Sequence, residues 1–386
     1  MSKSELPIIV GAGPAGLSAA LFLARRGCAA RLIEAREKPS RESRALVVNP
    51  RTLTLLEPTG VTSEMLAIGS PIHGVQFYRS GRVAGKLSFA GIHPKFPFML
   101  ALSQTVAERL LGHALDAAGV AVERGVRMVD CRNVPGGAEV LLEQPASDWR
   151  RREVVRAPWL LAADGAHSVA RRQLGIEREG SSLSRDWHFV DVPLRTSLAA
   201  DHAHVFFPEE GAFHFLIRVV EGKEVDGAKY PAWRILSNRP EPLSRLMQAE
   251  PAGRPVWKSS FRVSHRVDRT LNVGAVYFAG GAAHVHSPLG AREMNLGIED
   301  AFVFAAVAAA GHHSTYDRLR RPVDRRVVRR VKRLSQIASA DTKFYRFVRS
   351  AVFLAAIRTP WIRRRIAASF AGLDHKLPRR MVRAPW

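Results

Sequence analysis

Residues 6–34, LPIIVGAGPAGLSAALFLARRGCAARLIE, decide the fold of this chain. The apolar run Leu6–Val10 predicts a buried strand, and the glycines that follow it predict a tight turn. Leu17–Arg26 then has the pattern of an amphipathic helix, and Ala30–Ile33 has that of a second strand. A strand, a glycine turn, a helix and a strand in this order predict a Rossmann-like α/β domain.

Three glycines and one acid indicate what this turn binds. Gly11 permits the tight turn, Gly13 lets the backbone approach a pyrophosphate, and Gly16 allows close helix–strand packing. The unpaired N–H groups at the helix N-terminus suit phosphates. Glu34, about 20 residues beyond the glycines, suits a hydrogen bond to a ribose hydroxyl and disfavours a 2′-phosphate. The segment therefore predicts a site for FAD or NAD rather than NADP. This segment alone does not distinguish FAD from NAD.

A second glycine-rich segment lies more than 260 residues further along the chain. Tyr277–Asp300 reads YFAGGAAHVHSPLGAREMNLGIED, which predicts a strand that runs into a glycine turn. A helix over Met294–Ala310 follows. Because strands run into glycine turns at both ends of the chain, we expect distant segments to close over one long cofactor, FAD.

Several blocks in family order give the chain a resemblance to a known family. It resembles the class A, single-component FAD-dependent aromatic hydroxylases of the para-hydroxybenzoate hydroxylase type, over about residues 5–305. The blocks are the GAGPAG turn with Glu34, Ser43-Arg44-Ala45 leading into Pro50-Arg51-Thr52, the Gln104 helix start QTVAERL, the Asp164-Gly165 motif and Tyr277–Asp300.

This resemblance implies an activity and a set of cofactor-binding residues. In that family NAD(P)H reduces FAD, O2 adds to give a flavin C4a-hydroperoxide, and one oxygen is transferred to an electron-rich aromatic or polyketide-like small molecule. The FAD-binding residues that we expect are Gly11, Gly13, Ala15, Gly16, Glu34, Ala35, Arg36, Arg44, Gln104, Asp164, Gly165, Gly281, Pro288, Gly290 and Asn295. Asp164 and Gly165 also predict a sharp, hydrogen-bonded turn after an apolar strand. The resemblance further implies that Asp164 helps to hold the visiting nicotinamide cofactor.

The Tyr277–Asp300 block departs from the family's wording, GDAAH…PxGGxGMN, at three positions. Gly281 replaces an aspartate that, by resemblance, would bond the ribityl chain, and losing one charged hydrogen bond weakens binding by about 1.5–3 kcal/mol. Ala291 and Glu293 replace glycines, so we expect the backbone here to be less strained or differently bent. The charge of Glu293 suits the helix N-terminus but opposes a reduced, anionic flavin. We expect FAD to bind, with turnover slowed or altered.

The middle of the chain predicts a different architecture. Short alternating runs at Ala203–Phe207, Gly211–Val219 and Ala232–Ser237 predict antiparallel strands of a substrate-covering sheet. We therefore expect an inserted β-sheet substrate region and C-terminal helices beside the Rossmann-like, three-layer FAD domain. The expected boundaries are 1–72, 96–179 and 266–310 for the FAD-binding domain, 73–95 and 180–265 for the substrate-binding region, and 311–386 for a basic C-terminal helical region.

No catalytic side chain is assigned from the sequence. The flavin carries the difficult chemistry, so neither a triad nor a metal cluster is expected, and no HExxH, CxxC or GxSxG motif occurs. His214 would serve as the base for a phenol if its strand face looked toward the flavin. A lone histidine on a strand is more often structural, and we favour that interpretation.

Two other interpretations of the function stay open. The first is different FAD-dependent redox chemistry on the same fold, such as a dehydrogenase. Halogenation is disfavoured, because halogenases of this fold carry a WxWxIP segment and none of the seven tryptophans has another two positions away. The second is a flavin-fold protein whose turnover is impaired by the three departures. The choice of NADH or NADPH is open as well.

Charge is concentrated in the last fifth of the chain. From Gly311 to Trp386 there are 20 Lys or Arg and 4 Asp, which accounts for +16 of the formal net charge of +23. The plain interpretation is a set of C-terminal helices with solvated basic faces. A sharper one is peripheral attachment to a membrane surface, because Phe344–Ile357 and Trp361–Phe370 place aromatic and aliphatic residues beside arginines. Nucleic acid is not an expected partner, since no recognised motif accompanies the charge.

Cysteine usage and the N-terminal sequence favour a cytoplasmic location for the protein. A peripheral location at the inner membrane surface is the alternative. The two cysteines, Cys28 and Cys131, are far apart and match no motif, as in a reducing compartment. The first strand begins too early to leave room for a signal peptide, and no run of 18 strongly apolar residues occurs. We expect a soluble or peripheral protein.

Overall fold

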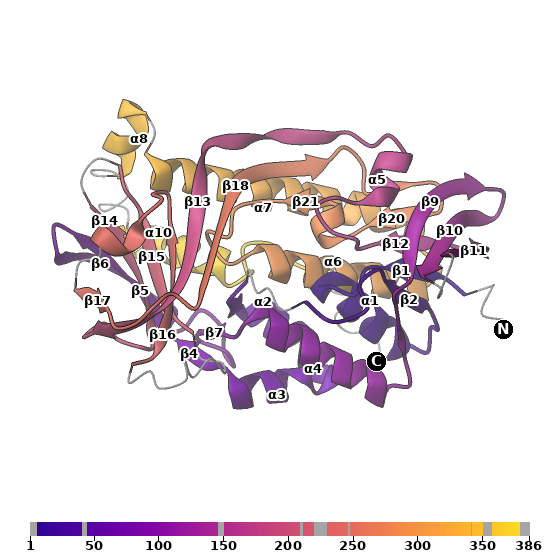
Figure 1. Cartoon of the computed structure of the whole chain (residues 1–386), viewed down its shortest axis with the longest axis horizontal. Coiled ribbons are helices and arrows are strands. Elements are labelled where there is room, and N and C mark those ends of the chain that lie inside the picture. The colour runs from indigo at the N-terminus through magenta and orange to yellow at the C-terminus, as the bar shows by residue number, and fades with distance from the viewer. Residues whose placement is uncertain are drawn as a thin grey trace.

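The computed structural model describes residues 6–40, 45–145, 150–208, 211–219, 230–245, 248–340, 342–349 and 357–378. Its Rossmann-like part is built on a sheet that brings together strands from distant parts of the chain (Figure 1). The sheet order is β19 (Asn272–Val273), β20 (Val276–Phe278), β12 (Leu160–Ala162), β1 (Ile8–Val10), β2 (Arg31–Glu34) and β8 (Val122–Arg124). All neighbours are parallel except β19 and β20. The predicted Rossmann-like sheet is confirmed.

Both faces of this sheet are covered, because its central strands β20, β12 and β1 are apolar. The three buried residues of β1, Ile8, Ile9 and Val10, require cover on both faces. One layer contains α1 (Pro14–Ala24), α4 (Gln104–Ala117) and α6 (Glu293–Ala309). The other side carries a small antiparallel sheet of β9 (Arg127–Val134), β10 (Gly137–Pro145) and β11 (Arg150–Ala157), with α5 (Val169–Gln173) beside it. Phe22 of α1 meets Phe302 of α6 edge to face, with ring centroids 5.4 Å apart.

A second, larger sheet forms the other half of the molecule (Figure 1). Its order is β21 (His284–Val285), β18 (Trp257–Asp268), β13 (Arg178–Thr196), β16 (Ala232–Ser237), β15 (His214–Arg218), β14 (His202–Phe207), β5 (Gly74–Arg79) and β6 (Arg82–Ser88), and β17 (Ala249–Pro251) pairs with β13. The three strands predicted between residues 203 and 237 are confirmed. The long strands β13 and β18 run from the nucleotide-binding half into this sheet, so they cross the expected boundaries at residues 180 and 265. The division into domains stays a proposal.

The remaining elements are a short sheet, several short helices and the C-terminal helices. A short sheet contains β3 (Val47–Val48), β7 (Met99–Ala101) and β4 (Ser70–Ile72), and α2 (Pro50–Leu56), η2 (Glu57–Thr59) and α3 (Val61–Ile68) follow β3 in the chain. Single turns occur at η3 (Pro242–Arg245), η4 (Gly280–Ala282) and η5 (His313–Thr315). The C-terminal region contributes α7 (Tyr316–Ser339), α8 (Lys343–Phe347) and α10 (Pro360–Phe370). Within the described residues, no helix is both long and apolar enough to cross a bilayer.

Candidate functional site

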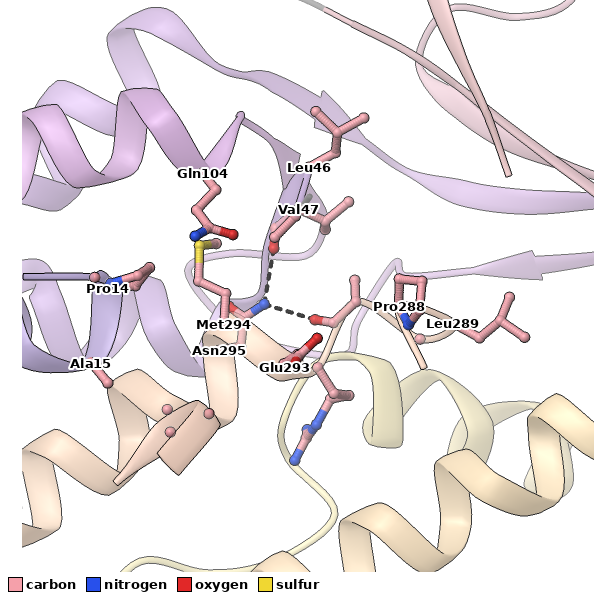
Figure 2. Close-up of a pocket in the computed structure, with 18 of the residues that line it drawn as sticks. Pro14, Ala15, Leu46, Val47, Gln104, Pro288, Leu289, Glu293, Met294 and Asn295 are labelled. Atoms are coloured by element: carbon pink, nitrogen blue, oxygen red, sulfur yellow. Dashed lines mark hydrogen bonds between the residues drawn. The ribbon is translucent and has the colours of Figure 1, made fainter. Parts of the chain in front are cut away.

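One cavity of about 800 Å³ joins the two halves of the molecule. At one end it is lined by the glycine turn after β1, and at the other by the inner face of the large sheet. The glycine-rich segment after β20 lines the same cavity, and Figure 2 shows its residues Pro288, Glu293 and Asn295 near Ala15 and Gln104. Both glycine segments therefore line one continuous space, the arrangement that we expect of distant segments that close over one long cofactor.

The glycine turn has the geometry that close backbone packing requires. Gly11 has φ +101°, and a Cβ built there would lie 2.5 Å from the carbonyl oxygen of Ala163. A Cβ on Gly16 would lie 1.8 Å from the carbonyl oxygen of Gly11, so no side chain is tolerated at either position. A Cβ on Gly13 would meet nothing within 4 Å, because Gly13 faces the cavity. The backbone at Gly13 is thus open to a ligand, and Ala15 lines the cavity beside it.

Glu34 organises the ribose end of the cavity. Its carboxylate accepts the N–H of Ala12 at 2.8 Å and that of Arg36 at 3.0 Å, and it also pairs with the Arg36 side chain at 3.2 Å. Although burial acts to raise it, the hydrogen bonds from Arg36 and Ala12 hold the pKa of Glu34 below its ordinary value. Glu34, Ala35 and Arg36 all line the cavity. An ionised Glu34 suits a hydroxyl donor, as predicted for a ribose.

Gln104 and Glu108 face the same end from α4. Ser103 caps this helix by accepting the N–H of Val106 at 3.3 Å, and Gln104 donates from Nε2 to Glu108 Oε1 at 2.8 Å. Burial raises the pKa of Glu108. Glu108 also lines the cavity. It is the acid of the QTVAERL block, but we assigned a role in that block to Gln104 alone.

The carboxyl group of Asp164 shows whether the cavity suits a ligand with hydrogen-bond donors. Its Oδ2 accepts the N–H of Val169 at 2.7 Å. Its Oδ1 is buried and makes no hydrogen bond within the described part of the chain. Burial raises the pKa of this carboxyl group. Because Asp164 and Gly165 line the cavity, a ligand that carries hydroxyl or N–H groups would satisfy the unpaired oxygen. FAD fits this requirement.

The glycine-rich segment after β20 is held by hydrogen bonds between the Asn295 side chain and backbone groups. Figure 2 shows Asn295 at its centre: Nδ2 donates to the carbonyl oxygens of Val47 at 2.9 Å and Ala291 at 2.7 Å. Oδ1 of Asn295 accepts the N–H of Asn49 at 2.9 Å. Pro288 and Gly290 line the cavity beside it. The side chain of Asn295 therefore holds in place the segment that forms this part of the cavity wall.

The three departures have distinct structural consequences. Ala291 adopts φ +52°, so the left-handed conformation that favours glycine is retained, and the expectation of a relaxed or rerouted backbone is wrong on this point. Glu293 begins α6 and lines the cavity. A Cβ on Gly281 would lie 3.1 Å from Cα of Gly165, because the segment packs tightly on the Asp164-Gly165 turn. Arg178 joins these segments, donating to the carbonyl oxygens of Gly281 at 2.7 Å and of Ala166 at 3.1 Å.

A buried ionic network supports this wall from behind. Asp300 accepts the N–H of Gly280 at 3.0 Å and pairs with His284 at 2.8 Å. Arg320 donates to Asp300 at 2.8 Å and to Asp324 at 3.2 Å. His284, Asp300 and Asp324 approach one another as metal ligands do, but the guanidinium of Arg320 already supplies the positive charge. We therefore assign the cluster to structure.

The far end of the cavity is an aromatic chamber. Its rings come from strands of the large sheet and the loop after β6: Phe77, Phe89, Phe189, Phe207, Phe213 and Phe215. Arg234 also faces the chamber, held by Asp191 through two hydrogen bonds of 2.7 Å. Its guanidinium lies 4.7 Å from the ring centroid of Trp257. The pair adds polarity to the chamber but almost no net charge.

His214 lies on the wrong face of β15 to act as a base. Phe213, Phe215 and Ile217 line the cavity, whereas His214 is buried on the opposite face, where Nδ1 meets Ser237 Oγ at 3.0 Å. Alternation along the strand separated the two faces correctly, but did not say which one points inward. The conditional role of His214 as a phenol base is therefore wrong.

Two parts of the wall fall outside the predicted set, and one predicted residue cannot be placed. Ile366 and Phe370 of α10, with Leu334, Ile337 and Ala338 of α7, line the cavity, although no residue of the basic C-terminal helical region was among the expected site residues. A Cβ on Gly290 would lie 3.2 Å from the Phe370 ring. Arg44 lies outside the described residues.

Comparisons with known proteins agree with this geometry. Residues 6–331 match a family model described as an FAD binding domain. The 6-methylpretetramide 4-monooxygenase of Streptomyces rimosus is 32% identical over 320 residues, which are 77% of this chain and 54% of that protein. The pentachlorophenol 4-monooxygenase of Sphingobium chlorophenolicum is 27% identical over 317 residues, 78% of this chain and 57% of that protein. The chain thus spans little more than half the length of these relatives.

A solved structure shows the same fold over almost the whole chain. The p-nitrophenol 4-monooxygenase PnpA from Pseudomonas putida DLL-E4 superposes with a TM-score of 0.83 and covers 97% of this chain and 99% of its own. The two sequences are 20% identical. The predicted α/β fold is thereby confirmed.

Proposed function

This chain belongs to the FAD-binding family of class A aromatic monooxygenases, and on that premise we propose that it hydroxylates an aromatic or polyketide-like small molecule with NAD(P)H and O2. The observation that carries the proposal is the single cavity that leads from the dinucleotide turn to an aromatic chamber. Membership of the family confirms the predicted FAD cofactor. When bound, reduced FAD would supply the activation of O2 for transfer of one oxygen atom.

The residues of this chain would hold the cofactor along the cavity. Glu34 would accept a ribose hydroxyl, and the open backbone at Gly13 would meet the pyrophosphate. The unpaired oxygen of Asp164 would accept a further hydroxyl or N–H group. The wall at Gly290 would lie against the flavin. The remaining proposed contacts follow from their places on the lining: Gly11, Ala15, Ala35, Arg36, Gln104, Gly165, Gly281, Pro288 and Asn295. Gly16 does not line the cavity, and its proposed part is the close packing that holds the turn at Gly11.

The aromatic chamber indicates the kind of substrate. Phe77 and Phe207 stack with an interplanar angle of 10°, and flat apolar walls of this kind suit a planar ring system. Arg234 is neutralised by Asp191, so the chamber offers hydrogen bonding without a free positive charge. We therefore propose an uncharged, multi-ring aromatic substrate in preference to a small carboxylated phenol. Among the described residues that line the chamber, we assign none as an acid or base, so orientation and exclusion of water are the chamber's proposed contributions.

The proposal is tested by measuring NAD(P)H oxidation and O2 uptake over a panel of neutral polycyclic phenols and small carboxylated phenols. Stimulated oxidation with a product heavier by one oxygen atom supports it. Reduction of FAD by substrate without oxygenation would favour a dehydrogenase on the same fold. A protein that binds FAD but shows neither reaction would favour the impaired enzyme, which the structure motivates through Ala291 and Glu293.

A further inference from the structure

The large aromatic side chains that are exposed in the described residues all lie in one C-terminal stretch. They are Phe344 and Phe347 of α8, 66% and 62% exposed, and Trp361 of α10, 61% exposed. Aromatic residues are normally buried, and exposed ones beside positive charge are typical of helices that lie at a membrane interface. Both helices lie at the end of the long axis opposite the N-terminus (Figure 1).

Charge around these aromatics has one sign. From residue 342 to 378 the sequence contains eight Lys or Arg and a single acid, Asp374. That acid is buried, with Arg292 at 3.6 Å and His375 at 3.1 Å. Arg358 and Arg363 to Arg365 are exposed. The surface around Trp361 is therefore strongly cationic, and its complement is an anionic surface.

The helix α10 separates this surface from the cavity. Trp361, Arg364 and Arg365 follow i, i+3 and i+4 spacing, so they share one face of the helix. Ile366 and Phe370, four residues apart on the opposite face, line the cavity. One face of α10 thus carries aromatic and basic side chains on the protein surface, and the opposite face forms part of the wall of the apolar chamber.

The segment that carries the aromatics is firmly anchored to the fold. Arg349, just after α8, donates to the carbonyl oxygens of Ala212 and Ala338, each at 3.1 Å. Ile357, just before α10, packs on Gly85 of β6, where a Cβ would lie 3.3 Å away. The exposed aromatics of α8 and α10 therefore lie next to residues that contact the main fold.

We propose that this end of the molecule docks on an anionic phospholipid surface through Trp361, Phe344 and Phe347 and the arginines of α10. The arginines attract the headgroups, and the aromatic rings enter the interface. Because α10 also lines the cavity, docking brings the apolar chamber next to lipid. Docking of this kind requires only the exposed aromatic and basic side chains, and it does not depend on the proposed hydroxylation.

Flotation of the full chain with vesicles tests this proposal. Wild-type protein is expected to float with phosphatidylcholine vesicles containing about one third phosphatidylglycerol at low salt, not with phosphatidylcholine alone, and to be released at about 0.5 M salt. Substitution of all three arginines, Arg363→Gln, Arg364→Gln and Arg365→Gln, is expected to weaken partitioning on the order of 100-fold, since each arginine contributes about fivefold. Trp361→Ala is expected to weaken it by about tenfold.

The matched control removes three exposed arginines from the opposite end of the molecule, Arg151→Gln, Arg152→Gln and Arg156→Gln on β11 (Figure 1). It has the same net charge as the α10 variant and is expected to float almost like wild type. Each variant must keep the wild-type melting temperature, which excludes misfolding. Equal loss in the control, or no flotation of wild type at low salt, overturns the proposal. Tighter binding to single-stranded RNA than to vesicles, lost with the α10 arginines, also overturns it and assigns the surface to nucleic acid.

Discussion

Gly281 packs directly on Gly165: a Cβ built on Gly281 would lie 3.1 Å from Cα of Gly165 and 3.3 Å from the N–H nitrogen of Ala166. The two glycines thus bring together the segments that the resemblance places around one flavin. Arg178 fastens the same junction through the carbonyl oxygens of Gly281 and Ala166. An aspartate at position 281 would add a ligand group but would push against this turn.

The first prediction separates these two effects of residue 281. Gly281→Ala adds only the Cβ and is expected to weaken FAD binding, because the Gly165 turn must move by a few tenths of an ångström. Gly281→Asp adds a charged acceptor, whose hydrogen bond contributes about 1.5–3 kcal/mol. We expect the aspartate variant to bind FAD at least about tenfold more tightly than the alanine variant, and more tightly than wild type. Fluorescence titration of the apoprotein gives the Kd, and equal affinities of the two variants would refute a ligand role for this position.

The second prediction concerns backbone strain at Ala291. An L-residue in the left-handed region costs roughly 1–2 kcal/mol, part of which glycine offsets by its greater freedom in the unfolded chain. Ala291→Gly is therefore expected to raise the free energy of unfolding by up to about 1 kcal/mol in urea denaturation. Ala308→Gly, in the last turn of α6, is the control and should lower it by up to about 1 kcal/mol. A loss of stability in both variants would contradict the assigned strain.

The third prediction tests the unpaired oxygen of Asp164. Asp164→Asn keeps the shape and replaces one acceptor by a donor, whereas Asp164→Ala removes both. We expect the Kd for FAD to rise by about tenfold or more in each, the equivalent of about 1.4 kcal/mol, because a buried acceptor for the cofactor is lost. Asp130→Asn, on β9, is the control and should leave the Kd unchanged. Unchanged affinity in both Asp164 variants would remove this residue from the cofactor site.

The fourth prediction concerns the charge that Glu293 places on the cavity wall. A carboxylate near the flavin disfavours the gain of negative charge on reduction. Glu293→Gln is therefore expected to raise the midpoint potential of bound FAD on the order of 30 mV, which equals about 1.4 kcal/mol for a two-electron couple. Glu293→Asp, which keeps the charge, should stay close to wild type. A potential that is the same in the glutamine variant and wild type would place the carboxylate too far away to act.

The fifth prediction follows from Asp324 in the network behind the wall. Burial, together with the Asp300 carboxylate, raises the pKa of Asp324 to about 7. A carboxyl group with a raised pKa stabilises the fold while protonated, and this contribution is lost as the pH rises through the folded value. The free energy of unfolding should thus decrease between about pH 4 and about pH 7 by up to about 1.4 kcal/mol per pH unit.

Asp324→Asn should remove that part of the pH dependence. The raised pKa of His284 acts in the same direction and would remain in the variant. Asp317→Asn, near the surface of the same helix, is the control and should keep the wild-type slope. Equal slopes in wild type and the Asp324 variant, measured by urea denaturation at several pH values, would contradict the raised pKa.

Local chemistry explains which parts of the site were predictable. Gly11, Gly16 and Glu34 act within one strand–turn–helix unit, where spacing alone fixes their neighbours. The two faces of β15 were also separable by alternation, so Phe213 and His214 were correctly placed apart. The direction of those faces was not predictable, because it depends on how the large sheet curves over a segment far away in the chain.

Contacts between distant segments account for the rest. Phe370 lies against Gly290 across 80 residues, and no periodicity in α10 indicates such a neighbour. The same holds for Arg178, whose sequence context is ordinary although it bridges two glycine turns. Ala291 shows a further limit. Its difference from the glycine of the family motif led us to expect an altered backbone, whereas Ala291 adopts the left-handed conformation despite the strain.

The most direct test of the account is the absorption spectrum of the purified protein, combined with the flavin released on denaturation. We predict a yellow protein with one FAD per chain, or an apoprotein that takes up one equivalent of added FAD. Protein that is colourless and remains so after incubation with excess FAD and removal of the unbound flavin would contradict the account.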